Sequence, residues 1–296
     1  MLKGYLNDFK FIIMTSKSRY WIILMLILFV VSENLSGQIL HFNRIKWKRE
    51  KIASGLIWKY SHTILKDTIP ENINILKINL HKRKISLSYN PKKNITVSKQ
   101  ASAVGAIAAV NAGFFNIKEG GSFAYIKTGG MIVDSDTAKK WTRNFNVNGA
   151  VLIDKKGHLS IDHVKMNNWY DSHKEYQDVL VTGPLLIERR NEMQLPPTPL
   201  VMNKHPRTAI GKRGNHKIVL VTLDGRTDQA KGMTIVELTD FMQSLNCKDA
   251  INLDGGGSTT MWISGKPYNG VVNMPCDNKK FDHEGEREVS DILVVK

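Results

Sequence analysis

One carboxylate followed by three glycines is the segment of this sequence best suited to chemistry. Within residues 250–262, Asp254 and glycines 255–257 separate two apolar stretches. Successive glycines give up side-chain packing, so they are typical of positions where the backbone approaches a ligand or adopts a positive φ. Their N–H groups, with those of Ser258 and Thr259, are suited to an anion-binding nest. A hairpin turn at Asp-Gly is the alternative interpretation, and this segment alone does not decide between the two.

A second carboxylate, Asp224, is placed in the same way, directly after the apolar segment 217–223. Thr234 and Glu237 have the spacing of a capping box, which predicts a helix to about residue 245 and a structural role for Glu237. The next strand, 250–253, ends at Asp254. A right-handed crossover through this helix makes the two strands parallel, so both carboxylates are expected at one edge of a sheet, where binding sites commonly lie.

Other elements follow from the spacing of apolar residues. Helical spacing over 101–108 predicts a helix that leads into a strand, which passes through Asn111 and ends at a glycine. Alternation predicts three pairs of strands, the first a hairpin at a sheet edge: 73–80 with 85–89, 150–153 with 158–161, and 179–181 with 185–187.

The N-terminus has the pattern of a secretory leader. Basic residues precede an uninterrupted apolar stretch at 21–31, and small polar residues follow it. Eleven apolar residues are too few to span a bilayer as a relaxed helix, which favours cleavage after about Gly37 over a retained membrane anchor. We therefore predict a leader at 1–37, a lead-in at 38–69 and one catalytic domain at 70–296. The expected location is periplasmic or extracellular, with membrane contact only through the N-terminal segment.

The composition indicates anionic partners. The chain has a net charge of +15, and removal of the four basic and two acidic residues of the leader leaves +13. Zinc-finger spacing, RNP aromatics and a helix-turn-helix pattern are all missing from the sequence, so a solvated basic face is expected rather than a nucleic-acid-binding surface. Cys247 and Cys276 are the two cysteines of the chain; a disulfide between them is open, because their spacing says nothing about their distance in space.

Seven segments taken in order resemble the phosphodiester glycosidase family. They are NAGFFN at 111–116, GPLLI at 183–187, PRTAIG at 206–211, DGR at 224–226, GMTIVEL at 232–238, NLDGGGSTTM at 252–261 and EREVS at 286–290. The resemblance covers about 70–296 and implies a single α+β domain with a mixed, largely antiparallel sheet and a few packed helices. It also implies hydrolysis of a sugar 1-phosphodiester on an exported or cell-surface glycan, which releases the sugar and leaves the phosphate on the aglycone. Glu288 and Asp291 depart from the family pattern, and the segment 193–203 has no counterpart in it, so it forms either a lid or a surface excursion.

The chemistry of this bond suggests roles for four residues. Its cleavage develops positive charge on the sugar and negative charge on the departing phosphate. Arg207 and Arg226 are candidates to clamp the phosphate, because guanidinium groups match phosphate oxygens. Asp254 is the candidate nucleophile or electrostatic stabiliser, and Asp224 is a second acid/base or the group that orients an arginine. The two carboxylates can exchange roles. A structural salt bridge between Arg207 and Asp224, and a turn role for Arg226, are the alternatives.

The remaining site residues are expected to bind substrate or a cation. The substrate-binding candidates are polar or lack a side chain and lie beside these four residues: Asn111, His205, Gly255, Gly256, Gly257, Ser258 and Thr259. No cofactor is required by the pattern, and a calcium or magnesium ion held by Asp254, Asp224 and Asn252 stays open. A non-catalytic surface protein of the same fold that binds a glycan or polyanion is the competing function.

Overall fold

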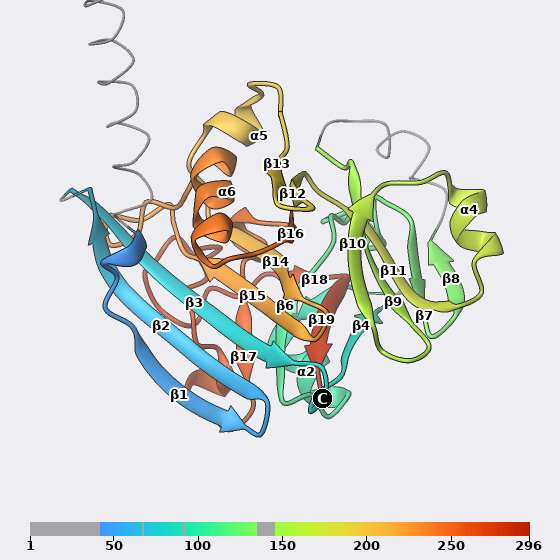
Figure 1. The fold of residues 1–296 in the computed structure, drawn as a ribbon. Coiled ribbons are helices and arrows are strands. Elements are labelled where there is room, and N and C mark those ends of the chain that lie inside the picture. Colours follow the sequence, from blue (N-terminus) through green and yellow to red (C-terminus); the bar gives the residue numbers. More distant parts are fainter. Residues whose placement is uncertain (1–41, 67, 91–92, 135–145) are drawn as a thin grey trace, which may run out of the picture.

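An eight-stranded antiparallel sheet is the largest layer of the protein. The computed structural model describes residues 42–66, 68–90, 93–134 and 146–296 (Figure 1). The strands of this sheet are, in spatial order, β1 (Lys48–Ala53), β2 (Leu56–Leu65), β3 (Ile69–Asn79), β15 (Lys217–Leu223), β14 (Arg207–Gly214), β16 (Asp249–Asn252), β12 (Leu185–Glu188) and β13 (Asn191–Glu192). Residues 48–65, expected as part of a lead-in, thus contribute its first two strands.

Two smaller antiparallel sheets and one strand pair complete the β structure. The five-stranded sheet has the order β10 (Leu159–His163), β9 (Gly149–Asp154), β11 (Tyr176–Thr182), β7 (Ile126–Thr128) and β8 (Met131–Asp134). The four-stranded sheet has the order β17 (Met261–Ile263), β6 (Ala108–Asn111), β19 (Asp291–Val295) and β4 (Ile85–Tyr89). The pair consists of β18 (Glu288–Val289) and β5 (Ile95–Thr96).

One apolar core joins the three sheets. A single cluster of buried side chains includes Leu220 of β15, Val151 of β9 and Leu293 of β19. Burial of this shared surface is the main favourable term in folding, and it makes the sheets parts of one domain. The predicted α+β fold with largely antiparallel sheets is confirmed.

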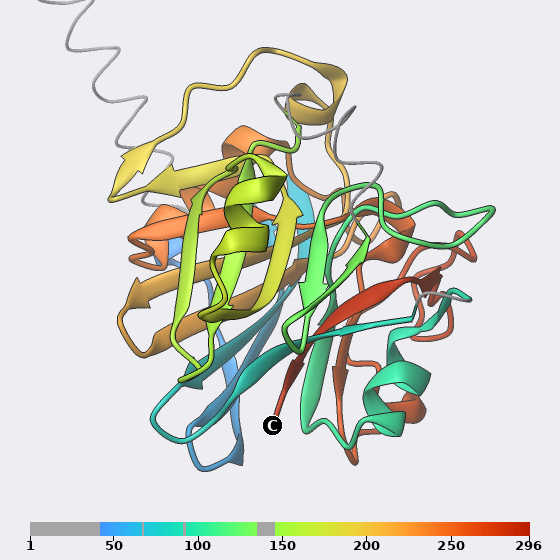
Figure 2. The same ribbon diagram turned by 90° about the vertical axis from the view of Figure 1, so that its right-hand side faces the viewer.

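Short helices cover the sheets. They are α2 (Val97–Ala103), α4 (Asn167–Ser172), α5 (Pro199–Met202) and α6 (Ile235–Ser244), with 3₁₀ turns η1 (Gly256–Ser258) and η2 (Tyr268–Gly270). The apolar face of α6 packs on the eight-stranded sheet (Figure 1). α4 lies against the five-stranded sheet (Figure 2), and its buried Tyr170 packs on that sheet. Within the described ranges, no helix is long and apolar enough to cross a membrane. The expected leader lies outside the described residues.

The expected start of α6 and the expected strand directions are confirmed. The Thr234 hydroxyl accepts from the Glu237 N–H, and the Glu237 carboxylate accepts from the Thr234 N–H, each at 3.0 Å. β14 is antiparallel to both β15 and β16, so these two strands run in the same direction with β14 between them. Their carboxyl ends, and the start of β14, therefore share one edge of the sheet.

Two of the three predicted strand pairs are wrong. β3 lies inside the eight-stranded sheet between β2 and β15, whereas β4 belongs to the four-stranded sheet. Likewise β11 and β12 belong to different sheets. A polar tip predicts a turn, but long-range burial selects the partner strand; residues 71–76 of β3 are buried on both faces, as expected of an interior strand. The hairpin of β9 and β10 is confirmed, as is α2 leading into β6.

Candidate functional site

The glycine segment is held at the shared sheet edge between two other strand ends. The Asp254 N–H donates to the Ala112 carbonyl at 2.8 Å, just after β6, and the Gly256 N–H donates to the Pro206 carbonyl at 2.9 Å, just before β14. The segment joins β16 and β17, which lie in different sheets, so the hairpin interpretation is wrong. The chain instead turns through η1.

Most N–H groups of the glycine run are bonded within the protein. The Gly255 N–H donates to the Asp254 carboxylate at 2.9 Å. The N–H groups of Ser258 and Thr259 donate to the carbonyls of Gly255 and Gly256, each at 3.2 Å. With Gly256 bonded to Pro206, the open anion-binding nest predicted from the sequence is not formed by these groups. A ligand at this turn would depend chiefly on side chains.

The glycines are required because guanidinium groups and backbone press against them. Gly256 has a φ of 62°, and a Cβ there would lie 3.0 Å from Nη2 of Arg226. A Cβ on Gly257 would lie 2.6 Å from Cζ of Arg287, and a Cβ on Gly255 would lie 2.6 Å from the Pro206 carbonyl oxygen. The bare turn therefore allows Arg226 and Arg287 to lie directly on its backbone.

Asp254 is a partly exposed carboxylate at the start of this turn, within reach of the positive charge of Arg287. Desolvation by burial raises the pKa of Asp254 to about 6. The Ser258 hydroxyl, the Gly255 N–H and the positive charge of Arg287 act in the opposite direction, and the negative charge of Asp291 adds to the increase. The carboxyl group is consequently mostly ionised at neutral pH but retains basicity suited to catalysis.

Asp224 is fully buried and surrounded by N–H donors. Its Oδ2 accepts from Asn72 Nδ2 at 2.6 Å and from the Met274 N–H at 2.9 Å, and its Oδ1 accepts from Asn273 Nδ2 at 2.7 Å. Desolvation by burial raises the pKa of Asp224 to about 7, against the effect of these bonds. The carboxylate thus ties β3 and the 273–274 segment to the end of β15.

Arg207 is also buried, and its hydrogen bonds go to main-chain carbonyls rather than to Asp224. Its Nε donates to the Met233 carbonyl at 2.9 Å, and its Nη2 donates to the Leu200 and Asn203 carbonyls at 2.8 and 2.9 Å. Burial lowers the pKa of Arg207 to about 10. The structure thus places its Nη2 against the α5 segment, which belongs to the proline-rich stretch whose role the sequence left open, and its Nε against the chain just before α6.

Arg226 differs from Arg207 because its side chain is exposed. It has a φ of 64°, and its Nη2 lies 3.3 Å from His205 Nδ1. Burial lowers the pKa of His205, as do the charges of Arg207 and Arg226, so the neutral ring is the acceptor. Arg226 forms no ion pair with any described residue, which leaves its charge available to an anion.

Two asparagines expected at the site are part of its frame. Asn111 Nδ2 donates to the Asp254 carbonyl at 2.6 Å, and Asn111 Oδ1 accepts from the Thr208 hydroxyl at 2.7 Å and the Thr260 N–H at 3.1 Å. Asn252 Nδ2 donates to the Gly183 carbonyl at 2.7 Å. Both side chains are buried, so Asn111 holds the turn in place.

The donor set for a cation does not fit well around these residues. No group of three or more His, Cys, Asp or Glu side chains suited to a metal occurs in the described ranges. Both oxygens of Asp224 face N–H donors, which compete with a cation for the same lone pairs. Asn252 Oδ1 is buried without a partner among the described residues. We derive no catalytic step through a metal.

Cys247 and Cys276, for which the sequence left a disulfide open, are both buried and free in the structure.

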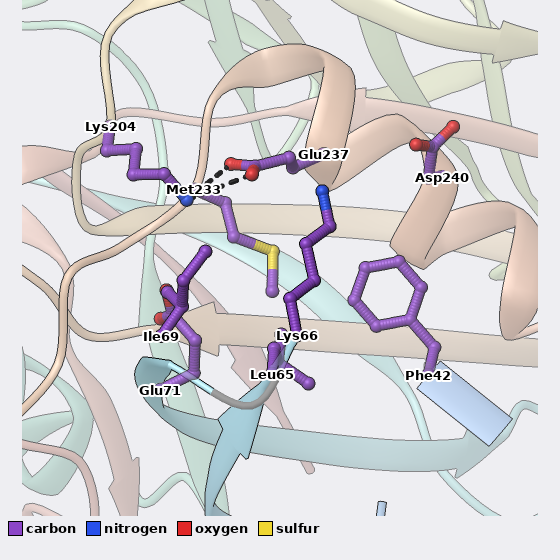
Figure 3. A pocket seen from close by; sticks show the side chains of 9 residues that line it. All are labelled: Phe42, Leu65, Lys66, Ile69, Glu71, Lys204, Met233, Glu237 and Asp240. Atoms are coloured by element: carbon purple, nitrogen blue, oxygen red, sulfur yellow. Dashed lines mark hydrogen bonds and ion pairs between the residues drawn. The ribbon is translucent and has the colours of Figure 1, made fainter. Parts of the chain in front are cut away.

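A further buried carboxylate, Glu71, lies behind the Arg226 loop. Its Oε2 accepts from the Gly232 N–H at 3.2 Å, and burial raises its pKa to about 8. Figure 3 shows Glu71 with the bonded pair Lys204 and Glu237 around a cavity of about 20 Å³. This volume holds about one water molecule, so the cavity is not a substrate site.

Several residues of the site were not foreseen from sequence. Asn72, Asn273 and Met274 bind Asp224, and Arg287 pairs with Asp277 at 3.0 Å from Nε to Oδ1. Asp291, noted only as a departure from the family pattern, is buried and accepts from the Gly113 N–H. An asparagine within the apolar strand 69–79 was the available signal for Asn72, whereas the others lie in a segment without periodicity.

Comparison with known proteins identifies relatives of this chain. The sequence model of the phosphodiester glycosidase family matches residues 104–296. Over 201 residues the chain is 26% identical to the N-acetylglucosamine-1-phosphodiester alpha-N-acetylglucosaminidase of Bos taurus, covering 63% of this chain and 36% of that protein. Over 68 residues it is 40% identical to the SPbeta prophage-derived uncharacterized protein YomE of Bacillus subtilis, covering 23% of this chain and 11% of that protein. The matches thus span about a tenth to a third of these relatives.

The fold has a solved counterpart. The zebrafish N-acetylglucosamine-1-phosphodiester alpha-N-acetylglucosaminidase catalytic domain superposes with a TM-score of 0.65 at 19% identity, covering 84% of this chain and 83% of that one. A hypothetical protein from Synechocystis superposes with a TM-score of 0.61 at 14% identity, covering 84% of this chain and 63% of that one. At these identities the likeness concerns the fold.

Proposed function

Because the chain belongs to the phosphodiester glycosidase family, we propose that it hydrolyses the glycosidic bond of a sugar 1-phosphodiester, releasing the sugar and leaving the phosphate on the aglycone. The observation that carries this proposal is the turn that begins at the partly exposed Asp254, where the guanidinium groups of Arg226 and Arg287 lie on Gly256 and Gly257. A carboxylate on a turn that carries two guanidinium groups suits a reaction that separates a cationic sugar from an anionic phosphate.

Arg226 is the proposed phosphate-binding cation. It is exposed, it lies on Gly256, and it has no carboxylate partner among the described residues. Arg287 lies on Gly257 but already pairs with Asp277, so its charge is partly neutralised. Arg226 therefore supplies most of the stabilisation of the developing phosphate charge, and Arg287 supports the carboxylate of Asp254.

Asp254 is the proposed carboxylate at the anomeric carbon. Its pKa of about 6 leaves it mostly ionised at pH 7, as a nucleophile or an electrostatic stabiliser requires. Phosphate is a good leaving group, so the reaction places a smaller demand on a general acid than ordinary glycoside hydrolysis does. His205, beside Arg226, is placed to hold that side chain.

Asp224 and Arg207 are proposed as positioning residues. Asp224 uses three hydrogen bonds to connect β3, β15 and the 273–274 segment, and Arg207 fixes the α5 segment through two carbonyls. Each is buried, so their proposed effect on turnover is indirect, through the placement of Arg226 and Asp254.

The test is a product analysis with a panel of glycosyl phosphodiesters. We expect free sugar and a phosphate monoester on the aglycone from the wild-type chain, and at least about 100-fold slower turnover from Asp254→Asn. Asp228→Asn, in an exposed ion pair with Lys231, is the matched control and should retain full activity. Release of sugar 1-phosphate would indicate phosphodiesterase chemistry. If neither the wild type nor the variants turn over any phosphodiester of the panel, and all bind polyanions in a salt-dependent way, the competing binding function is supported.

We also infer that the chain acts outside the cytoplasm. The support is the leader pattern at 1–37 and the cationic mature composition. Mass analysis of the protein recovered from the periplasm and medium tests this inference; an intact N-terminus found only in the cytoplasm would contradict it.

A further inference from the structure

A cavity of about 360 Å³ lies beside the candidate site, between the β2–β3 face and the segment 272–283. We call it the β2–β3 cavity. Its wall from the sheet is formed by paired residues on one face: Tyr60 lies opposite Asn74, and His62 opposite Asn72. Lys46 and Lys48, which are exposed, line its rim. The cavity therefore combines aromatic, amide and cationic groups in one concave surface.

The aromatic rings form an ordered row. Trp58 and Tyr60 stack with centroids 4.2 Å apart at an interplanar angle of 18°. The Trp58 indole N–H donates to Asn74 Oδ1 at 3.0 Å, which fixes the indole ring. Lys48 Nζ lies 5.6 Å from the centre of the Tyr60 ring. Trp58 is buried, so the partly exposed Tyr60 is the ring on which a ligand can stack, and its fixed position limits the conformational freedom lost on binding.

Three contacts connect the wall of the cavity to residues of the candidate site. Two residues that line it, Asn72 and Met274, both donate to the carboxylate of Asp224. A third, His62, lies 3.0 Å through Nε2 from the Gln229 carbonyl, on the loop that carries Arg226. The cavity wall is therefore attached both to the end of β15 and to the loop that carries Arg226.

Most of the cavity wall precedes residue 104, where the match to the family begins. The lysines at 46 and 48, the aromatic residues of β2 and the amides of β3 all belong to this earlier part of the chain. The cavity is thus built mainly by residues outside the matched segment. A surface that determines which substrate this particular chain binds is expected to lie in such a part of the sequence.

We propose that the β2–β3 cavity binds an anionic oligosaccharide, which forms the part of the substrate beyond the phosphodiester. The proposal rests on the proposed function for the position of the scissile bond. Sugar rings present apolar C–H faces and hydroxyl groups, which match aromatic rings and amides, and the acidic groups of the oligosaccharide match Lys46 and Lys48.

The test measures binding by the full chain with an oligosaccharide that holds no scissile bond. The probe is a tetrasaccharide of alternating glucuronate and N-acetylglucosamine, with neutral chitotetraose and oligo(dT) for comparison. We expect the acidic tetrasaccharide to bind best, and Tyr60→Ala to weaken its binding about tenfold. Lys48→Ala should weaken binding at low salt and reduce its salt dependence.

Matched variants separate binding from folding. Tyr60→Phe keeps the ring and should bind as the wild type does. Lys51→Ala removes an exposed lysine of the same strand, opposite Ile57 rather than Tyr60, and should have no effect. Equal binding by all variants would overturn the proposal, as would tighter binding of oligo(dT) with the same dependence on Tyr60 and Lys48.

Kinetics distinguish failure of this proposal from failure of the proposed function. Tyr60→Ala and Lys48→Ala should leave turnover of a sugar phosphodiester with a methyl aglycone unchanged, while raising KM for a substrate with an oligosaccharide aglycone. Loss of activity on both substrates would contradict the role of the cavity. Tetrasaccharide binding that survives in Asp254→Asn, without turnover of any phosphodiester by the wild type, would remove the proposed reaction alone.

Discussion

Replacement of Asp254 by asparagine should separate activity from stability. The pKa of Asp254 rises from 3.8 to about 6 on folding, so its contribution to stability is complete below about pH 4 and is lost as the pH rises through 6. This shift corresponds to about 3 kcal/mol of destabilisation at pH 8, taken as an upper limit because the side chain is partly exposed. Asparagine keeps an acceptor for the Gly255 N–H without this cost.

The expected result is a variant that is inactive and at least as stable as the wild type. Loss of a carboxylate at the reacting centre should lower kcat/KM about 100- to 10 000-fold. In urea unfolding, the free energy of unfolding of the variant relative to that of the wild type should increase from pH 4 to pH 8, by up to about 3 kcal/mol. In the wild type, kcat/KM should rise about tenfold per pH unit below 6 and level off above it.

Two results would refute this reasoning. Full activity of Asp254→Asn would remove the carboxylate from the reaction. A stability difference between variant and wild type that does not change from pH 4 to pH 8 would show that the carboxyl is not desolvated. Asp228→Asn, whose carboxylate is exposed, is the control, and its activity and pH-rate profile should match those of the wild type.

Four other outcomes follow from the contacts described. Arg226→Gln should lower kcat/KM about 10- to 100-fold in steady-state kinetics without lowering the melting temperature, since the side chain has no ion pair among the described residues; an unchanged kcat/KM contradicts the clamp. Asn111→Ala should lower the free energy of unfolding by about 2–4 kcal/mol in urea, and a loss under about 1 kcal/mol would mean that its three hydrogen bonds are dispensable. Glu71 has a pKa raised to about 8, so its contribution to stability is lost as the pH rises from about 4.5 to 8; Glu71→Gln should flatten the pH dependence of unfolding over this range, and an identical slope argues against a buried acid. Dialysis against EDTA should leave kcat/KM unchanged, because Asp224 faces N–H donors; recovery only on adding calcium or magnesium would reverse this view.

Local patterns in the sequence were sufficient for the elements that position the site. The capping box at Thr234, the apolar strand ends at Asp224 and Asp254, and the glycine run all depend on residues near one another in the chain. Their periodicity and turn chemistry act over a few residues, so the parallel direction of β15 and β16 could be predicted.

Partners distant in sequence were decided only by tertiary structure. β3 and β4 adjoin along the chain but lie in different sheets, because burial of both faces of β3 selects β2 and β15 as its neighbours. The same holds for charge: Arg207 and Arg226 have the same side chain, yet one is buried against carbonyls and the other is exposed over Gly256. Solvation and hydrogen-bond partners set what a guanidinium or carboxyl group can do, and both depend on residues brought together by folding.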